Sequence, residues 1–288
     1  MRSIQLLITD LDDTLWDWLN IWHSSFSEFI VNISDAFSID MDSLKKAFSI
    51  LHQKYHTTEC SFLLEEIPLL TKSQIEFIRN QPFKNNKSIL HQYHSTRLKN
   101  TVLYPKVRDT LLAIRERNIK IIGFTESNEF YTSDRIKKTN LDGILHTIYS
   151  PEDHELPSSF NRFSEGNYEL QGTKIKTLPP KFKKPNKEVL LRIISDFHGH
   201  LNSTIYVGDK ISRDVLMAKK AGVHSVYAKY GDKSTDLRYE LLKQVTHWSH
   251  EEVLQEIEFR RKMLNNDITP EYTIDSFEEI INFINIFD

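Results

Sequence analysis

Six polar side chains in this sequence could together hold a phosphate group and a divalent cation. Each lies directly after a short apolar run or near the start of a predicted helix: Asp10, Asp12, Thr125, Lys184, Asp209 and Asp214. Carboxylate oxygens are ligands that Mg²⁺ prefers, and this ion often takes one or two carboxylates together with a substrate phosphate. A hydroxyl and an ammonium group can bind the other phosphate oxygens. These residue types therefore predict a site for phosphate and Mg²⁺, if the fold brings them together.

Alternating strands and helices are the elements that must bring these residues together. Apolar runs over 4–9 and 119–124 end directly before Asp10 and Thr125, as buried parallel strands do when they open onto a functional loop. Further strands are predicted over 144–149, 203–207 and 223–228. The helices predicted between the strands cover 107–118, 128–139, 186–197 and 212–221. This alternation predicts an α/β fold with a parallel sheet, whose ligands bind beyond the carboxyl ends of the strands.

The segment 16–100 has a different pattern. Apolar residues recur there at spacings of three and four, which predicts several amphipathic helices and no strand. Three other segments interrupt or follow the alternation. The polar, proline-containing segment 151–183 predicts an irregular excursion or hairpin at the edge of the sheet. Residues 239–263 predict an additional helix, and residues 276–286 a closing helix.

The composition excludes several classes of protein. The chain has 288 residues, of which 39% are hydrophobic and 27% charged, as is typical of a globular protein. A net charge of -3 provides no general attraction to nucleic acid or to an anionic membrane, and no segment approaches the roughly 20 apolar residues that span a bilayer. Cys60 is the only cysteine, so no intrachain disulfide can form, which favours a cytoplasmic location. The histidines lack the H-E-x-x-H spacing of a zinc site.

The candidate site residues lie in motifs that resemble, in order, those of the haloacid dehalogenase (HAD) superfamily. Asp10-Leu11-Asp12-Asp13-Thr14-Leu15 is similar to its first motif, D-x-D-x-[TV]-L after a strand. Thr125 is similar to the second motif, and Lys184 with Pro185 to the third. Residues 208–214, GDKISRD, are similar to the fourth, G-D-x-x-x-x-D. Four ordered motifs are far more specific than any one of them.

The resemblance implies a fold and a division of the chain. Residues 1–15 and 101–288 would form the HAD core, an α/β domain with a Rossmann-like parallel sheet. Residues 16–100 would be an inserted helical cap subdomain of the C1 type. The core would include the irregular insert at about 151–183 and the extra helical segment at about 239–263.

The resemblance also implies a role for each motif residue. Asp10 would attack phosphorus and form an aspartyl-phosphate, and Asp12 would act as general acid and then as general base. Thr125 and Lys184 would bind the phosphoryl oxygens. Asp13 carries no such role, and as a residue in the middle of the first motif it is expected to cap a helix or lie at the surface rather than bind metal. The Mg²⁺ ion would be held by the Asp10 side chain, the Asp12 backbone carbonyl, Asp209 and Asp214, the last either directly or as an anchor.

Other residues carry weaker hypotheses. Thr57, Thr58 and Glu59 lie in a polar break between predicted helices, where they could contact substrate, although a surface turn is the commoner explanation of such a loop. Many relatives carry asparagine directly after the threonine of the second motif, whereas this chain has Glu126, for which a substrate contact is a further hypothesis. Lys183 competes for the role of the third-motif lysine, but the family's lysine is followed by proline.

The predicted function is that of a Mg²⁺-dependent phosphatase for a small phosphorylated metabolite, acting as a monomer or homodimer. A dehalogenase typically lacks the second acid of the first motif, so Asp12 argues against it. A phosphonatase needs a Schiff-base lysine in the cap, for which Lys45, Lys46 and Lys54 are candidates. A phosphomutase would transfer the phosphoryl group to a sugar. A non-catalytic interaction protein is the remaining alternative, but it has no need of converging carboxylates.

Overall fold

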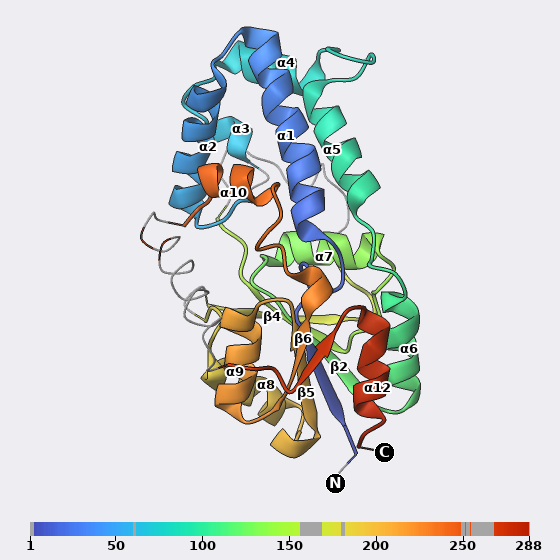
Figure 1. Cartoon of the computed structure of the whole chain (residues 1–288). Helices are drawn as coiled ribbons and strands as arrows, with labels where there is room; N and C mark the ends of the chain where they lie inside the picture. Colours follow the sequence, from blue (N-terminus) through green and yellow to red (C-terminus); the bar gives the residue numbers. More distant parts are fainter. Residues whose placement is uncertain are drawn as a thin grey trace.

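Seven parallel strands form one sheet in the computed structural model, which describes residues 3–59, 62–155, 169–179, 182–248, 251, 254 and 268–287. The strands follow the order β4-β3-β2-β1-β5-β6-β7 (Figure 1). They are β1 Leu6–Thr9, β2 Lys120–Phe124, β3 Thr147–Pro151, β4 Lys174–Leu178, β5 Thr204–Gly208, β6 His224–Ala228 and β7 Tyr272–Ile274. The predicted α/β fold with a parallel sheet is confirmed.

Strand β1 lies in the middle of the sheet, and its side chains pack on both faces. Leu7 belongs to an apolar cluster with α6, α7 and α12, whereas Leu6 and Ile8 belong to a cluster with α8 and α9 on the other face. Because both faces are covered, the central strands are nearly continuous apolar runs, which made them recognisable from sequence. These helices are α6 Val107–Glu116, α7 Glu129–Lys138, α8 Lys187–Asp196, α9 Leu216–Ala221 and α12 Ile280–Ile284.

Five further helices lie beyond the carboxyl ends of the strands (Figure 1). We call them the helical layer: α1 Trp18–Phe37, α2 Met41–Tyr55, α3 Leu63–Glu66, α4 Lys72–Asn80 and α5 Ile89–Asn100. Their apolar faces form a core of their own, which includes Trp22, Phe26 and Phe48. The side chains of Asp17 and Asp40 cap α1 and α2 by accepting hydrogen bonds from backbone N–H groups of the first turn. The predicted helices of this segment are present, and its role as a cap stays a prediction.

Helix α10 (Tyr239–Val245) packs against the helical layer although it follows β6 in the chain. Leu242 and Val245 are buried in the apolar core of that layer, and Nδ1 of His52 lies 2.6 Å from the backbone oxygen of Val245. We predicted the segment 239–263 as part of the core, but the apolar face of this helix packs against α2 instead. Residues 249–250, 252–253 and 255–267 lie outside the described part of the chain.

Both edge strands of the sheet were missed in the sequence. The irregular excursion predicted over 151–183 contains β4, which pairs in parallel with β3, so its described part is no hairpin. An edge strand exposes one side to water, and β4 therefore has polar residues where a central strand has apolar ones. Strand β7 has only three residues, which is too short for a periodic signal. Residues 156–168 and 180–181 of the predicted excursion, and Cys60, lie outside the described residues.

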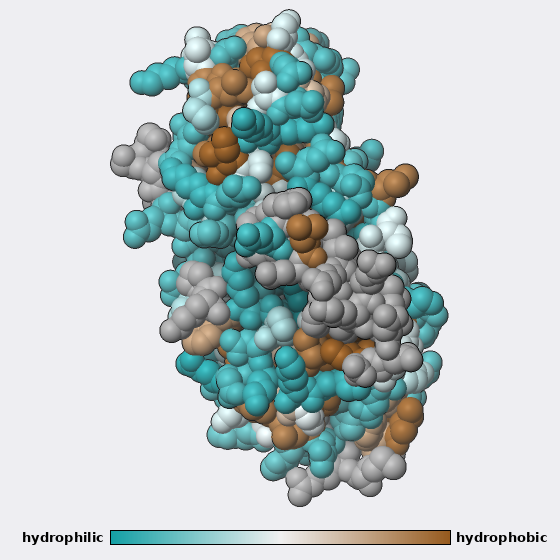
Figure 2. All heavy atoms as spheres, turned by 60° about the vertical axis from the view of Figure 1, so that its left-hand side comes forward, coloured by the Kyte–Doolittle hydropathy of each residue, from teal (hydrophilic) through white to brown (hydrophobic). Residues whose placement is uncertain are grey.

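The boundaries of several predicted elements also shifted. The strand predicted over 144–149 occupies Thr147–Pro151, because Ile144 and Leu145 are buried in the turn that precedes it. The helix predicted over 212–221 begins with a π-helical turn, Ile211–Val215. In the view of Figure 2, hydrophilic residues dominate the described surface and hydrophobic ones are scattered. None of the described helices is long and apolar enough to cross a bilayer.

Candidate active site

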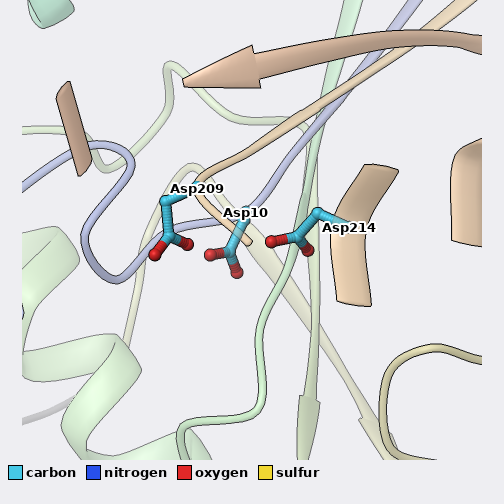
Figure 3. A group of neighbouring side chains, drawn as sticks. All are labelled: Asp10, Asp209 and Asp214. Carbon is cyan, nitrogen blue, oxygen red and sulfur yellow. The ribbon is translucent and has the colours of Figure 1, made fainter. Parts of the chain in front are cut away.

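Three buried carboxylates from separate parts of the chain point toward one another (Figure 3). They belong to Asp10, Asp209 and Asp214, and one oxygen of each lies within 4.8 Å of one oxygen of the others. Asp10 follows β1 and Asp209 follows β5, and these strands pair with Thr9 opposite Val207. Parallel pairing of two strands that end at the same level thus brings the two carboxylates together.

Asp214 reaches the site from the π-helical turn, and Gly208 makes room for it. A Cβ atom on Gly208 would lie 2.4 Å from Cγ of Asp214, so any larger residue would displace this carboxylate. Asp214 accepts hydrogen bonds from the Tyr206 hydroxyl at 2.9 Å and from the backbone N–H of Lys210 at 3.0 Å. These contacts hold the side chain in place.

The ammonium group of Lys184 lies between the carboxylates of Asp10 and Asp214. Its Nζ lies 2.5 Å from Oδ1 of Asp10 and 2.9 Å from Oδ1 of Asp214. Burial alone would lower the pKa of Lys184, but Asp10 and Asp214 outweigh burial and raise this pKa well above its ordinary value. The lysine therefore stays charged at neutral pH. Of the two adjacent lysines, Lys184 is the one that the structure brings to the acids, while Lys183 lies on the wall of the same pocket.

Burial raises the pKa of two of the acids at this site. Burial raises the pKa of Asp10 to about 6, even though Lys184 opposes this shift. Burial also raises the pKa of Asp209 well above its ordinary value. Oδ1 of Asp209 is buried and has no hydrogen-bond partner among the described residues. An acceptor oxygen of this kind, beside two other carboxylates, fits a hard divalent cation, so these residues suit Mg²⁺.

Asp12 lies at the same end of the sheet but is oriented differently. Its Oδ1 accepts a hydrogen bond from Nε1 of Trp16 at 2.7 Å, and its Oδ2 accepts one from the Ser127 hydroxyl at 2.6 Å. The hydroxyl of Thr125 lies 3.4 Å from the same Oδ2. The structure therefore brings Thr125 to Asp12, and both line one pocket with Asp10 and Lys184.

Asp13 is buried rather than on the surface, which corrects one of the two expectations for it. Its Oδ1 accepts a hydrogen bond from the backbone N–H of Leu19 at 3.0 Å, at the first turn of α1. This is the capping contact that the sequence predicted. Burial raises the pKa of Asp13 to about 7.

Glu126 connects two loops of the site. Its Oε1 accepts a hydrogen bond from the backbone N–H of Lys184 at 3.1 Å, and its Oε2 pairs with Arg213 at 2.5 Å. Burial would raise the pKa of Glu126, but Arg213 and Lys184 hold it below its ordinary value. Glu126 thus fixes the position of the Lys184 backbone. A substrate contact of Glu126 stays a prediction.

The predicted specificity loop contributes to the same pocket. Thr57, Thr58 and Glu59 all line it. The backbone oxygen of Thr58 accepts a hydrogen bond from Nε1 of Trp22 at 3.3 Å, and the Thr57 hydroxyl bonds to the backbone of Glu59. The Glu59 carboxylate faces Arg97 and Arg135, and a contact of this loop with substrate stays a prediction.

The pocket has a volume of about 730 Å³ and lies between the sheet and the helical layer. Trp18 and Leu19 line it from α1, and Tyr239 and Leu242 line it from α10. Its floor consists of the acids described above. A cavity of this size is large enough to enclose a small organic phosphate.

Two residues near Asp12 were not identified from the sequence. Ser127 follows Thr125 by two positions, so a second hydroxyl in that loop was a signal available without the structure. Arg135 is a single arginine within an amphipathic helix, and nothing in its spacing distinguishes it. Arg135 contacts Glu59 only because α7 packs against the loop that contains Glu59, and the sequence does not show this packing.

The chain is similar to several known proteins. Residues 4–222 match the family model of haloacid dehalogenase-like hydrolases. A glyceraldehyde 3-phosphate phosphatase from Pyrococcus furiosus is 25% identical over 244 residues, which cover 83% of this chain and 87% of that protein. A protein with the same description from Pyrococcus abyssi is 22% identical over 235 residues, covering 79% and 82%.

Solved structures share the fold. A HAD phosphatase from Thermococcus onnurineus is similar with a TM-score of 0.55 and 16% identity, covering 98% of both chains. A HAD hydrolase from Bacillus subtilis, in a structure bound to magnesium, is similar with a TM-score of 0.52 and 12% identity, covering 99% of this chain and 100% of that one.

Proposed function

The chain belongs to the haloacid dehalogenase-like hydrolase family, and we propose that it is a Mg²⁺-dependent phosphatase that hydrolyses a small phosphomonoester. The observation that carries this proposal is the convergence of Asp10, Asp209 and Asp214 around the charged Lys184. The two Pyrococcus relatives are phosphatases by description, which supports the same reaction. Glyceraldehyde 3-phosphate is therefore a reasonable first member of a substrate panel.

The proposed reaction begins with Asp10. Its carboxylate would attack phosphorus, the phosphorus–oxygen bond to the leaving group would break, and an aspartyl-phosphate would form. Asp12 would donate its proton to the leaving oxygen and would then take a proton from the water that hydrolyses the intermediate. Both side chains line the pocket, so each can reach a substrate bound there.

Charge develops on the phosphoryl oxygens during both steps. Lys184 and the Thr125 hydroxyl would bind these oxygens, and both line the pocket that contains Asp10 and Asp12. A Mg²⁺ ion held by Asp10, Asp209, Asp214 and the Asp12 backbone oxygen would neutralise part of the same charge when bound. Asp214 would also keep Lys184 in position through its 2.9 Å contact.

One rival reaction is disfavoured by the position of its candidate residues. Lys45 and Lys54 pair with Asp42 and Glu66. Neither of them, nor Lys46, is among the described residues that line the pocket, where a Schiff-base lysine of a phosphonatase would have to lie.

Release of phosphate from 4-nitrophenyl phosphate, with and without Mg²⁺, tests the proposal. Asp10→Asn retains the shape of the side chain but removes the nucleophile, and it should reduce turnover by more than about 10³-fold. Asp42→Asn removes an exposed carboxylate from α2 and should leave turnover unchanged, which controls for the loss of one charge. Equal turnover of the Asp10→Asn variant and the unchanged protein would refute the assignment.

A further inference from the structure

We propose that Arg135 is a positioning residue for Asp12, and that Glu59 of the helical layer holds Arg135 in the arrangement that orients the Asp12 carboxylate in the pocket. The inference rests on the proposed function, because it concerns the proton that Asp12 gives to the leaving group. It is carried by an uninterrupted series of contacts from the helical layer to the pocket. The series runs from Glu59 through Arg135 and Ser127 to Asp12.

The first link joins the helical layer to α7. Nη1 of Arg135 donates to both carboxylate oxygens of Glu59, at 2.9 and 3.0 Å, and Nη2 donates to Oε2 at 3.1 Å. Arg97 donates to Oε1 of the same carboxylate at 2.5 Å. Glu59 and Arg135 are both buried, so solvent screens this pair little. The outer face of the guanidinium is thus occupied by Glu59.

The second link reaches Asp12 through a hydroxyl. Nη2 of Arg135 donates to Oγ of Ser127 at 2.8 Å. A guanidinium cannot accept a hydrogen bond, so the single hydroxyl proton of Ser127 must point elsewhere, and it is donated to Oδ2 of Asp12 at 2.6 Å. Trp16 donates to the other oxygen of Asp12. Arg135 therefore decides the direction of one of the two hydrogen bonds that orient the acid.

The remaining nitrogen of Arg135 lies near Asp12 itself. Nε is buried, has no hydrogen-bond partner among the described residues, and lies 3.5 Å from Oδ1 of Asp12. Arg135 thus forms an ion pair with Asp12 in addition to its contact through Ser127, and the hydrogen bonds to Glu59 fix the guanidinium in that position.

This role differs from simple packing. Buried ion pairs are often no more stabilising than apolar side chains of the same volume, so stability alone gives no reason for an arginine here. A residue that acts through the general acid has a specific signature. Its loss should affect reactions that need protonation of the leaving group more than reactions that do not.

Two substrates of nearly the same shape separate these effects. Phenyl phosphate has a basic leaving group that needs a proton, whereas 4-nitrophenyl phosphate leaves as a stable anion. The value of kcat/KM reports steps up to the first irreversible one, which includes loss of the leaving group. The ratio of kcat/KM for 4-nitrophenyl phosphate to that for phenyl phosphate is therefore the quantity to measure.

Glu59→Gln and Arg135→Gln should each raise this ratio about tenfold or more relative to the unchanged protein, within the 10²- to 10⁴-fold range of general acid catalysis. Ser127→Ala is a smaller change that leaves Glu59 and Arg135 paired, and it should raise the ratio as well. If the Glu59→Gln and Arg135→Gln variants fail to fold, the ratio measured for Ser127→Ala decides whether the inference holds. Glu65→Gln breaks the ion pair with Arg79 inside the helical layer, away from Asp12, and should leave the ratio unchanged.

The outcomes distinguish this inference from the proposed function. If the unchanged protein hydrolyses both substrates but every folded variant lowers both kcat/KM values by the same factor, Arg135 has only a structural role and the inference is wrong. If the unchanged protein hydrolyses neither substrate, the proposed function fails, and this inference fails with it.

Discussion

Replacement of Glu59 by glutamine should change the way in which the stability of the protein depends on pH. Arg135 and Arg97 outweigh the effect of burial and lower the pKa of Glu59 from its ordinary value of 4.5 to about 2. A shift of this size corresponds to about 3 kcal/mol of stability, at about 1.4 kcal/mol for each pKa unit. The side chains of Glu59 and the two arginines are largely buried, so solvent screens their interaction little and the whole shift contributes to stability.

The sign follows from the direction of the shift. The folded protein favours the ionised carboxylate, so the contribution of Glu59 is fully present above pH 4.5 and is lost as the pH falls toward 2. Between pH 7 and pH 3.5 the folded protein should lose about 1.4 kcal/mol of it. The Glu59→Gln variant has no such contribution to lose. At pH 7 it should be less stable by about 3 to 5 kcal/mol, because it removes the anionic partner that Arg135 and Arg97 share.

Urea unfolding of both proteins at pH 7, 5 and 3.5, followed by circular dichroism, measures these free energies. The difference between the two proteins should shrink by about 1.4 kcal/mol as the pH falls to 3.5. Buried histidines such as His52, whose pKa burial lowers to about 4, titrate in both proteins and cancel in the difference. Asp42→Asn serves as the control and should change stability by less than about 1 kcal/mol. A difference that stayed constant from pH 7 to 3.5 would refute the low pKa of Glu59.

Three other perturbations have defined outcomes. Saturating Mg²⁺, at about 100 times its dissociation constant, should stabilise the protein by about 2.7 kcal/mol in a thermal-shift assay. The Asp209→Asn variant should show no such stabilisation. If Mg²⁺ stabilised the variant equally, the ion would bind elsewhere. Lys184→Met should reduce kcat for 4-nitrophenyl phosphate by about 10²- to 10³-fold, since it removes a prepositioned donor; a reduction of less than about tenfold would exclude a role on the phosphoryl oxygens. A Cβ atom on Gly231 would lie 1.9 Å from the backbone oxygen of Asp13, so Gly231→Ala should lower the free energy of unfolding by about 1 to 3 kcal/mol, and unchanged urea unfolding would contradict this packing.

Much of the fold was predictable because its signals are local. The central strands β1 and β2 are apolar runs, and each ends directly before a chemically active residue, Asp10 or Thr125. The helices of the helical layer have apolar residues at helical spacing, which the sequence alone displays. The edge strands β4 and β7 could not be predicted in this way, because their exposed positions and short lengths remove the apolar signal.

Some features of the candidate site were also predictable from the sequence, and others were not. The types and order of its acids, hydroxyl and lysine were readable along the chain, and the pairing of parallel strands accounts for their meeting. The contact of Glu59 with Arg135 joins residues 76 positions apart, and neither residue carries a local mark of its partner.

The amino-acid sequence by itself determined which groups can do chemistry and which segments form the central strands and helices, because spacing and apolar periodicity are properties of neighbouring residues. Only the tertiary structure decided that α10 packs with the helical layer, that Glu126 holds the Lys184 loop, and that Arg135 lies between Glu59 and Asp12. These contacts depend on how separate elements dock, and docking is governed by the complementarity of whole surfaces rather than by any short stretch of chain.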